Sequence, residues 1–325
     1  MMTSIERLRL LADDLTGALD SAARFVPTAG PIDVTWRDVA TAGSVAIDSG
    51  TRDLPTAMAR RRIESLAPLL DGGELAFKKI DSLLRGHVAL ELSACLRRFD
   101  HCVLAPAFPF QGRITRNGRQ LARSGDVWRD TGVDLAVELR AHGAAAQVRD
   151  AETDADLDAI VAEGRRLSGR VLWCGTGGLA GALAGNGVVP RPTLPRPILA
   201  LIGSDHPVSR AQVGAVPPFL RHAVVVCELP TGTDRREARE RIGDSFAVAL
   251  QRVPQPGTLF VTGGETLRDL CQAIGVTRLE VDGEIEPGVP TSLLRCGDWD
   301  GQRLVSKSGA FGDTGFLARL LGETR

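Results

Sequence analysis

Short apolar runs that end in a polar turn and continue into a helix-like segment recur along this chain. In its first half, strands are predicted over residues 8–12, 31–36, 44–47, 75–77 and 101–105, and the turns after them are rich in Asp, Ser, Thr, Arg or Gly. Such alternation of strands with helices predicts a parallel, doubly wound α/β sheet. Ligands bind in these sheets where strand carboxyl ends meet helix amino ends. The polar turns are therefore the candidate functional segments.

The length of the chain and one proline-rich segment indicate two domains. The chain has 325 residues, whereas single hydrophobic cores rarely grow beyond about 250–300 residues. Residues 186–197 contain four prolines, a composition typical of a linker. We expect a first domain over residues 1–185, this linker, and a second α/β domain over residues 198–325.

Composition and charge narrow the class of protein. Hydrophobic residues make up 43% of the chain and charged residues 24%, which is typical of a globular protein. The net charge of −1 argues against nucleic acid or an anionic membrane as the main partner. No apolar run approaches the ~18 residues of a membrane span. The six cysteines never approach CxxC spacing and indicate reduced core residues. Charged residues close to the amino terminus argue against a signal peptide, so we expect a cytoplasmic protein.

Two of the three lysines lie together at the end of the predicted strand 75–77. The chain uses 36 arginines but only three lysines, Lys78, Lys79 and Lys307. The turn that follows holds Asp81, Ser82 and Arg85. An ammonium beside a carboxylate, a hydroxyl and a guanidinium suits a small, anionic, hydroxylated substrate. The alternative is a strand edge with solvated charges.

Two aspartates, Asp13 and Asp14, follow the first predicted strand, and Thr16 lies at the expected helix start. Asp14 and Thr16 could be ordinary capping residues. They could equally bind substrate hydroxyls or help to hold a metal ion. Because neighbouring side chains of an extended segment alternate in direction, Asp13 is expected to point away from Asp14. Another polar turn, after residues 44–47, ends in Arg52.

An arginine-rich segment follows the predicted strand 101–105. Arg113, Arg116 and Arg119 lie within eight residues that also contain Asn117. Prolines at positions 106 and 109 suggest a rigid segment that holds the arginines in place, so that they could clamp a carboxylate. A solvated loop is the alternative.

Residues 175–180, after the strand predicted over 170–174, match the glycine pattern of dinucleotide-binding sites. That pattern normally opens the first strand–helix unit and is followed, about 20 residues later, by an acid for the ribose. Here it lies in the middle of the chain, and no Asp or Glu follows it before Asp205. A close-packed helix start, or a loop that faces an anion, is the favoured interpretation.

Two glycine-rich turns mark the second half of the chain. Gly263-Gly264 and the segment from Gly309 to Gly312 each follow a predicted strand and precede a helix. Backbone amides at such turns can cradle phosphate oxygens. Lys307 lies beside the second turn, and no GxxxxGK[ST] motif of P-loop ATPases is present. This pattern suggests that the first domain binds the substrate and the second binds phosphates.

Five stretches together resemble the four-carbon acid sugar kinase family. They are residues 12–18 (ADDLTGA), 79–86 (KIDSLLRG), 105–109 with Gly112-Arg113 and Asn117-Gly118, 261–266 (VTGGET), and 286–290 with 307–312. The resemblance implies a sugar-acid-binding domain, then a nucleotide-binding domain, with the active site in the cleft between them. The implied reaction uses ATP and Mg²⁺ to phosphorylate the terminal hydroxyl of a threonate, erythronate or 3-oxo-tetronate. The chain departs from the family at Leu83, usually Thr, and at the turn over residues 203–206.

The resemblance and the chemistry of phosphoryl transfer assign residues to each half. The nucleotide contacts would be Ser204, Gly263, Gly264, Glu265, Thr266, Lys307, Gly309 and Gly312. The candidate catalytic residues are Asp13, Asp14, Lys79 and Asp81, because the hydroxyl nucleophile needs a nearby proton acceptor. The substrate contacts would be Thr16, Arg52, Ser82, Arg85, Arg113 and Asn117. Asp14 is the preferred base and Asp313 its rival, while the metal ligands are not identified.

Two other functions stay open at the level of the sequence. One is a catalytically inactive sugar-acid or nucleotide sensor, and the other is a nicotinamide-dependent oxidoreductase that uses residues 175–180. A sugar acid and ATP are the expected small-molecule partners. The sequence does not fix the oligomeric state, and a homodimer is one possibility.

Overall fold

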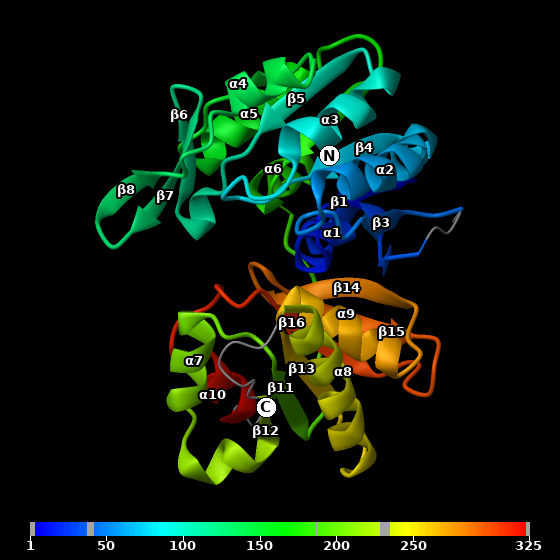
Figure 1. The fold of residues 1–325 in the computed structure, drawn as a ribbon, viewed down its shortest axis with the longest axis vertical. Coiled ribbons are helices and arrows are strands. Elements are labelled where there is room, and N and C mark those ends of the chain that lie inside the picture. The colour runs from blue at the N-terminus through cyan, green and yellow to red at the C-terminus, as the bar shows by residue number, and fades with distance from the viewer. Residues whose placement is uncertain (1–3, 38–41, 186, 228–234, 323–325) are drawn as a thin grey trace. The chain divides into compact units, whose positions relative to one another are not determined.

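The structure, a computed structural model of the chain, describes residues 4–37, 42–185, 187–227 and 235–322, with the side chains of residues 235–240 outside the description. It divides into two compact units, Met1–Val189 and Pro190–Arg325 (Figure 1). The division falls inside the segment that the sequence marks as a linker. The limits of the two functional domains stay a prediction.

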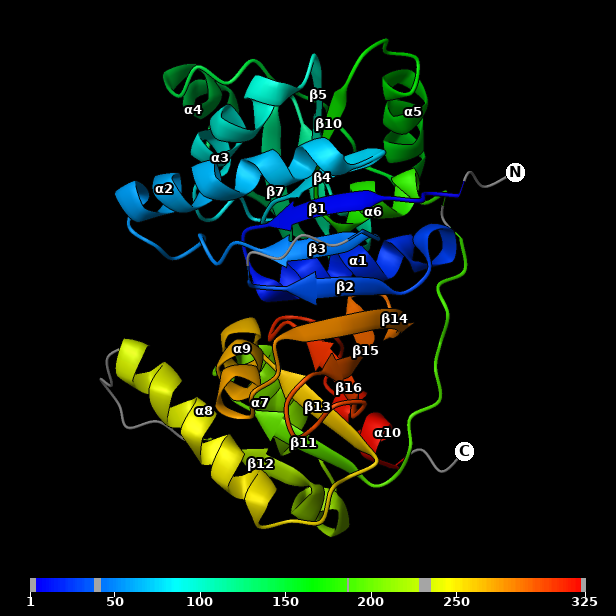
Figure 2. The same ribbon diagram turned by 90° about the vertical axis from the view of Figure 1, so that its right-hand side faces the viewer.

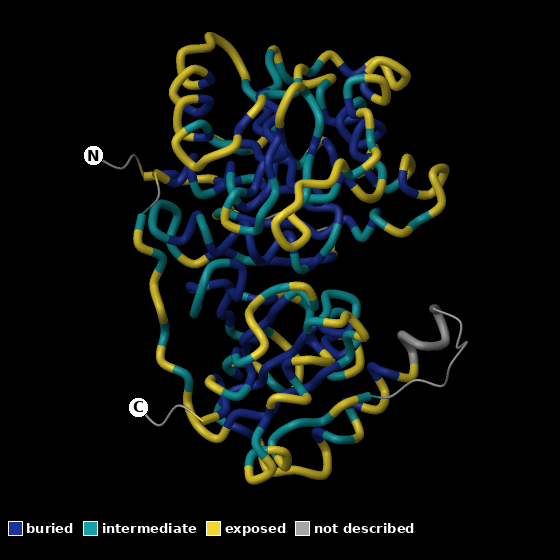
Figure 3. Tube along the Cα trace, turned by 90° about the vertical axis from the view of Figure 1, so that its left-hand side faces the viewer, coloured by how far each residue is buried: buried dark blue, intermediate teal, exposed yellow. Residues whose placement is uncertain are grey.

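A parallel sheet forms the centre of the first unit, with strand order β2-β3-β1-β4-β10-β5-β9. Its strands are β1 (Leu8–Ala12), β2 (Ile32–Thr35), β3 (Val45–Asp48), β4 (Leu75–Lys79), β5 (His101–Ala105), β9 (Gln147–Val148) and β10 (Val171–Gly175). Most residues of these strands are buried, and buried segments, dark blue in Figure 3, fill the interior of the unit. Burial on both faces explains why they read as apolar runs rather than as alternating patterns.

Helices cover both faces of this sheet (Figure 2). On one face α1 (Leu15–Ala29), α5 (Asp154–Gly164) and α6 (Gly177–Leu183) pack against one another. On the other lie α2 (Thr56–Leu66), α3 (Val88–Cys95) and α4 (Leu135–Ala141), with the short 3-10 helices η1 (Ala67–Gly72) and η2 (Leu96–Arg98). The rings of Phe25 in α1 and Phe77 in β4 meet edge to face, 5.8 Å apart. Because strand side chains alternate, Lys78 points toward α3 and Lys79 toward α1.

A small antiparallel sheet, β6-β7-β8, projects from the first unit (Figure 1). It comprises β6 (Arg113–Arg116), β7 (Arg119–Ser124) and β8 (Val127–Asp130), and it follows η3 (Pro109–Gln111). The sequence analysis predicted no strands in this segment. The hairpin turn is formed by Asn117 and Gly118, whose φ values of 51° and 73° are those of a tight turn between paired strands.

The second unit has a sheet of order β12-β11-β13-β16-β15-β14, in which β12, β11, β13 and β16 are parallel. Its strands are β11 (Ile198–Ile202), β12 (Val224–Val226), β13 (Thr258–Thr262), β14 (Arg278–Glu286), β15 (Val289–Arg295) and β16 (Arg303–Lys307). The strands β14, β15 and β16 pair antiparallel. The sequence analysis missed β15, which begins after a turn at Gly288 (φ 82°).

Helices again form two layers in this unit. The pairs in contact are α8 (Arg235–Gln251) with α9 (Gly264–Ala273), and α7 (Pro207–Gly214) with α10 (Phe316–Gly322), next to η4 (Pro218–Ala223). Phe260 of β13 and Phe316 of α10 pack with their rings 5.9 Å apart. The predicted fold class, doubly wound units with mostly parallel sheets, is therefore confirmed. Among the described residues, no helix is both long and apolar enough to cross a membrane.

Candidate active site

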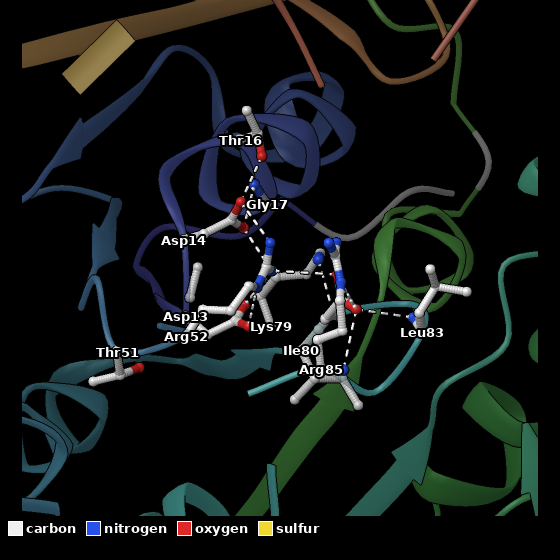
Figure 4. A network of polar contacts seen from close by, with 12 residues as sticks. Asp13, Asp14, Thr16, Gly17, Thr51, Arg52, Lys79, Ile80, Leu83 and Arg85 are labelled. Carbon is white, nitrogen blue, oxygen red and sulfur yellow. Dashed lines mark hydrogen bonds and ion pairs between the residues drawn. The ribbon is translucent and has the colours of Figure 1, made fainter. Parts of the chain in front are cut away.

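The carboxyl edge of the first sheet gathers the polar turns that follow β1, β3 and β4 (Figure 4). These strands are neighbours, and their ends are level, since Ala12 pairs with both Asp48 and Lys79. Turns that are far apart in the sequence therefore meet. Together they bring in the side chains of Asp13, Asp14, Arg52, Asp81 and Arg85, which we call the carboxylate–arginine cluster.

Arg52 lies at the centre of this cluster. Its Nε and Nη2 donate to the two oxygens of Asp13 over 2.7 and 2.8 Å. Its Nη1 and Nη2 each lie 2.7 Å from an oxygen of Asp14, and Nη2 is 3.6 Å from Oδ1 of Asp81. Asp13 and Asp14 therefore share one partner, although neighbouring side chains of an extended segment are expected to point apart. A guanidinium can bind along two of its edges, so two diverging carboxylates still reach the same side chain.

The charges around Asp13 and Asp81 keep both carboxylates ionised. Burial alone would raise the pKa of Asp13, but the charge and hydrogen bonds of Arg52 outweigh it and hold that pKa below its usual value. Burial likewise opposes ionisation of Asp81, yet hydrogen bonds from Arg85 and the charge of Arg52 hold its pKa well below the usual range. A carboxylate with such a low pKa accepts a proton poorly, which disfavours both as a general base.

Asp81 also organises the turn after β4. Its Oδ2 accepts from the backbone N–H groups of Leu83 and Arg85, over 3.1 and 3.2 Å, and from Arg85 Nε over 2.9 Å. The Arg85 side chain is 63% exposed. Arg85 thus has one edge bound to Asp81 and the rest of its guanidinium open to solvent, where it can meet an anionic ligand.

Asp14 is the N-cap of α1, as one of the two sequence interpretations predicts. Its Oδ1 accepts from the backbone N–H of Gly17 over 3.0 Å, and its Oδ2 accepts from the Thr16 hydroxyl over 2.6 Å. Its side chain nevertheless keeps 22% of its surface exposed, whereas that of Asp13 keeps 4%. Capping does not exclude a second role, so the assignments of Asp14 and Thr16 to catalysis and substrate binding stay predictions.

All three lysines use the same local geometry. Lys78 Nζ donates to the carbonyl of Lys79, Lys79 Nζ to that of Ile80, and Lys307 Nζ to that of Ser308, over 2.8 to 3.0 Å. Each lysine lies at or next to the end of a strand and turns back onto the next carbonyl. These bonds fix the backbone at the start of the turns. Lys79 Nζ also lies close to Gly17, where an added Cβ would approach it to 3.0 Å.

The arginine-rich segment does not form a three-arginine clamp. Arg116 pairs with Glu152, and Arg119 with Asp130 and Asp134. Arg113 differs, since it donates to the backbone carbonyls of Gln111 and Gly112 and lies within electrostatic reach of Asp81 and Arg85. Burial lowers the pKa of Arg113, while the charge of Asp81 raises it.

Asn117 serves the hairpin turn, where its backbone N–H donates to Asp150 over 2.6 Å. Among the described residues, its side chain makes no hydrogen bond to the carboxylate–arginine cluster, so a role in substrate binding rests on the family resemblance alone. Ser82 contributes its carbonyl, which accepts from Gln120 Nε2 over 2.9 Å.

The sequence analysis missed Gln120. This side chain is buried, donates to Ser82 and Pro106, and accepts from the Thr115 hydroxyl over 2.7 Å. It fastens the small sheet to the turn after β4 and so places Arg113 beside that turn. Gln120 lies between Arg119 and Leu121, a pattern that does not show that its amide is buried, and only a buried amide must be hydrogen-bonded.

The second unit brings together three turns at one edge of its own sheet. The strands β11, β13 and β16 are parallel neighbours, and Thr262 pairs with both Ile202 and Lys307. The side chain of Ser204 packs against Gly309, and that of Thr266 packs against Gly203. An added Cβ on Gly309 would lie 2.2 Å from Ser204 Oγ, and one on Gly203 would lie 2.3 Å from Thr266 Oγ1. These glycines are therefore required by close approach, and the amide-rich turns lie side by side.

Helix α9 begins in this set of turns. Gly263, its N-cap residue, has φ 101°, a conformation that favours glycine, and no side chain caps the helix. The first turn holds the predicted contacts Gly264 and Glu265. Uncapped amides at a helix amino terminus attract anions.

Lys307 supports the turn from Gly309 to Gly312 from beneath. It is 1% exposed and donates to the carbonyls of Ser308 and Phe311, over 3.0 and 2.9 Å. Gln212 donates to the carbonyls of Phe311 and Asp313. Burial lowers the pKa of Lys307 to about 8, against the opposing charge of Glu286. Two buried side chains, Lys307 and Gln212, thus bind the carbonyls of this turn. That Lys307 also binds the nucleotide directly stays a prediction.

Packing accounts for the glycines of residues 175–180. A Cβ on Gly175 would lie 2.5 Å from the carbonyl of Ala105, and one on Gly178 would lie 2.8 Å from that of Ala107. The Thr176 hydroxyl donates to Ala107 and accepts from the Gly178 N–H. This is the close-packed helix start that the sequence analysis favoured over a dinucleotide site.

A resident metal centre is not built into the part of the chain that the structure describes. There, no group of three or more His, Cys, Asp or Glu side chains is arranged to hold a metal ion. Mg²⁺ in phosphoryl-transfer enzymes is held mainly by phosphates and water, with one or two carboxylates.

Comparisons with known proteins identify both halves of the chain. Residues 8–135 match a family model described as a sugar-binding N-terminal domain, and residues 221–317 match one described as a nucleotide-binding C-terminal domain. Two curated relatives are a D-threonate kinase of Cupriavidus necator, 29% identical over 95% of each chain, and a D-erythronate kinase of Heliobacterium modesticaldum, 26% identical over 94% of each chain.

Solved structures agree on the fold. A Salmonella typhimurium protein described as a tRNA synthase superposes with a TM-score of 0.71, at 19% identity over 98% of this chain and all of that one. A Haemophilus influenzae protein of the DUF1537 family gives a TM-score of 0.65, at 20% identity over 95% and 98%. Likeness at this level of identity shows the fold alone.

A sugar-binding half and a nucleotide-binding half, each on its own doubly wound unit, define a carbohydrate kinase. The chain belongs to the four-carbon acid sugar kinase family, as the five sequence stretches predicted. The cleft between the two domains that the resemblance implies stays a prediction.

Proposed function

We propose that this protein transfers the γ-phosphoryl group of ATP to the terminal hydroxyl of a four-carbon sugar acid, with threonate and erythronate as the first candidates. The carboxylate–arginine cluster at the edge of the sugar-binding unit is the observation that carries the proposal. It offers cations for a carboxylate and oxygen acceptors for hydroxyls within one site. Relatives that span nearly the whole chain and are named as kinases of these two acids support it.

On the sugar-acid side, Arg85 is the first candidate for the substrate carboxylate. Its exposed edge can form the paired hydrogen bonds that carboxylates favour. Arg113, close enough to interact electrostatically with Arg85 and Asp81, adds a second cation. The oxygens of Asp14 and the hydroxyl of Thr16 would then accept from, or donate to, the substrate hydroxyls.

On the nucleotide side, the turns at Ser204, Gly263 and Gly309 would bind the triphosphate. Their backbone amides and the amino terminus of α9 supply partial positive charge, which suits phosphate oxygens. Lys307 adds charge from beneath the third turn. Mg²⁺, when bound with the nucleotide, would neutralise part of the triphosphate charge.

Proton removal from the acceptor hydroxyl is assigned to Asp14. Arg52 and Arg85 lower the pKa values of Asp13 and Asp81, which leaves these two weak proton acceptors. Asp14 is also more exposed than either of them. Lys79 would hold the turn beneath the substrate through its bond to Ile80.

We expect purified protein with Mg-ATP to phosphorylate at least one four-carbon acid. A panel of threonates, erythronates and 3-oxo-tetronates, with ADP release and phosphorus NMR of the product, measures this. Turnover should require Mg²⁺ because the triphosphate otherwise lacks its main neutralising charge. The Gly263→Asp variant serves as the inactive control, because it places a carboxylate where a phosphate of ATP is expected to bind. ADP release equal to that of the control across the panel would contradict the proposal.

The low pKa of Lys307 predicts a pH dependence of ATP binding. Below about pH 8 the ammonium is charged, and above it the side chain becomes a neutral amine that can still donate to both carbonyls. ATP should therefore bind roughly three- to tenfold more weakly at pH 9 than at pH 7, through loss of charge rather than of structure. Calorimetry on the wild type and Lys307→Met tests this. Identical pH profiles for the two proteins would contradict it.

The same group also predicts a stability change of known sign. The unfolded lysine keeps its proton up to about pH 10.5, whereas the folded one releases it near pH 8. The unfolded state thus binds more protons between these values, so this group makes stability rise with pH in that window. Any loss of ATP affinity there cannot be ascribed to unfolding caused by Lys307.

A further inference from the structure

A buried ion pair lies next to the carboxylate–arginine cluster and takes no part in it. Lys78 of β4 is fully buried, Glu91 of α3 is 1% exposed, and Nζ lies 2.7 Å from Oε2. An apolar pair of similar volume would often stabilise a protein as well as, or better than, a buried ion pair. Stability therefore gives no sufficient reason for the Lys78–Glu91 pair.

The other contacts of Lys78 and Glu91 indicate a structural role for the pair. Oε1 of Glu91 accepts from the hydroxyl of Thr51 over 2.5 Å. The Thr51 hydroxyl lies 2.8 Å from that of Ser49, which donates to the carbonyl of Ala12. Lys78 Nζ also donates to the carbonyl of Lys79. Glu91 is thus tied to the ends of three neighbouring strands, β1, β3 and β4.

The residues next to these anchors are the ones that form the cluster. Arg52 directly follows Thr51, and Asp81 lies two residues after Lys79. The distance between Arg52 Nη2 and Asp81 Oδ1, 3.6 Å, therefore depends on how the turn after β3 is set against the end of β4. Glu91 contacts both, because it binds Thr51 with one oxygen and Lys78 with the other.

We propose that Glu91 is a positioning residue for the sugar-acid site, and that it acts through Thr51 and Lys78 to hold Arg52 beside Asp81. This inference rests on the proposed function only in naming the ligand as a hydroxylated acid. Glu91 touches no substrate in this arrangement. Its loss should misplace the cluster, and errors of about 1 Å in such sites can cost 10²-fold in rate.

The first test removes one hydroxyl and keeps the side-chain shape. Thr51→Val should raise the KM for the sugar acid roughly tenfold, because Glu91 loses its partner and the turn after β3 loosens. The KM for ATP should stay within about twofold, since no nucleotide contact is touched. Thr28→Val is the matched control. Its hydroxyl bonds to a carbonyl in the last turn of α1, and the variant should keep both constants.

Two double variants separate the hydrogen bond from the charge. Lys78→Met with Glu91→Gln removes both charges and keeps an oxygen for Thr51, whereas Lys78→Met with Glu91→Leu keeps none. Both double variants replace the ion pair by two uncharged side chains and so leave no unpaired charge in the interior. Both should therefore fold. The first keeps the bond to Thr51 but loses the one to β4, so we expect it to raise the sugar-acid KM less than Thr51→Val does, and the second to match or exceed Thr51→Val. Equal, wild-type constants in both would overturn the proposal, and should either fail to fold, Thr51→Val decides.

A measurement without substrate separates this proposal from the proposed function. Hydrogen exchange of the free protein should be faster in Thr51→Val over residues 49–52 and 80–85, and unchanged in the second unit. If the wild type phosphorylates no acid but this change is seen, positioning by Glu91 stands and the proposed substrate is wrong. If the wild type is active and Thr51→Val shows wild-type exchange and KM, the positioning role is overturned.

Discussion

Replacing Arg52 by Met should be among the most damaging single changes in this protein. It removes a guanidinium that faces three carboxylates, those of Asp13, Asp14 and Asp81. Leaving buried charges without a partner typically costs about 3–5 kcal/mol. With 1.4 kcal/mol per tenfold, a similar loss in the site would lower kcat/KM for the sugar acid by roughly 10²–10⁴-fold.

The loss of stability in Arg52→Met should depend on pH, and its sign can be derived. In the wild type the pKa values of Asp13 and Asp81 lie below that of an unfolded aspartate. Their contribution is therefore present above the unfolded pKa and is lost as the pH falls through the folded values. In the variant, burial acts on Asp13 without the opposing charge of Arg52, so the pKa of Asp13 should be higher than in the wild type, even though Lys78 and Lys79 still lower it. The difference between the two proteins should thus shrink as the pH falls from 7 toward 4.

Urea unfolding at pH 7 and near pH 4.5 measures this difference. Arg98→Met is the matched control, because Arg98 pairs with Asp71 at the surface, where its side chain is 44% exposed. Its loss should cost less than about 1 kcal/mol at either pH. Arg52→Lys should lie between the two, since an ammonium cannot bind along two edges. A wild-type midpoint for Arg52→Met at pH 7 would show that the cluster is not a unit.

The strands could be predicted because each is an apolar run bounded by polar turns, and β1 and β5 were predicted with the bounds they have. Which of the polar turns contact one another could not be predicted from the sequence. It depends on the strand order β3-β1-β4, which brings Asp13 and Arg52, 39 positions apart, into contact. Sequence spacing says which turns lie at the carboxyl edge but not which of them are neighbours.

The sequence held signals for two features that the sequence analysis did not use. Asn117 and Gly118 form the hairpin turn between β6 and β7, and an Asn-Gly pair between short runs is a strong hairpin signal. The sequence analysis instead interpreted the three arginines around this turn as a clamp for a substrate carboxylate. Glu91 was overlooked as one acid on a helix. Two adjacent lysines in a buried strand must face opposite helix layers, however, and a buried ammonium requires an acid partner there.

Asp14→Asn is expected to have the largest effect on the chemical step. If Asp14 takes the proton of the acceptor hydroxyl, kcat should fall by roughly 10²–10⁴-fold, the usual scale for loss of a general base. Asparagine is as good an N-cap as aspartate, so the bond from the Gly17 N–H can persist. Arg52 also keeps its paired bonds to Asp13. Folding and ATP affinity should therefore change little.

The rival base, Asp313, provides the matched comparison within the same chain. It accepts from the Gly315 N–H and pairs with Arg319, near the start of α10. These contacts describe a residue that fixes a turn, so Asp313→Asn should lower kcat by about tenfold or less, as loss of a cap or charge partner does. Single-turnover rates of both variants with saturating substrates decide between them. If Asp313→Asn abolishes transfer while Asp14→Asn does not, the base belongs to the nucleotide-binding unit. The carboxylate–arginine cluster would then bind the sugar acid without activating it.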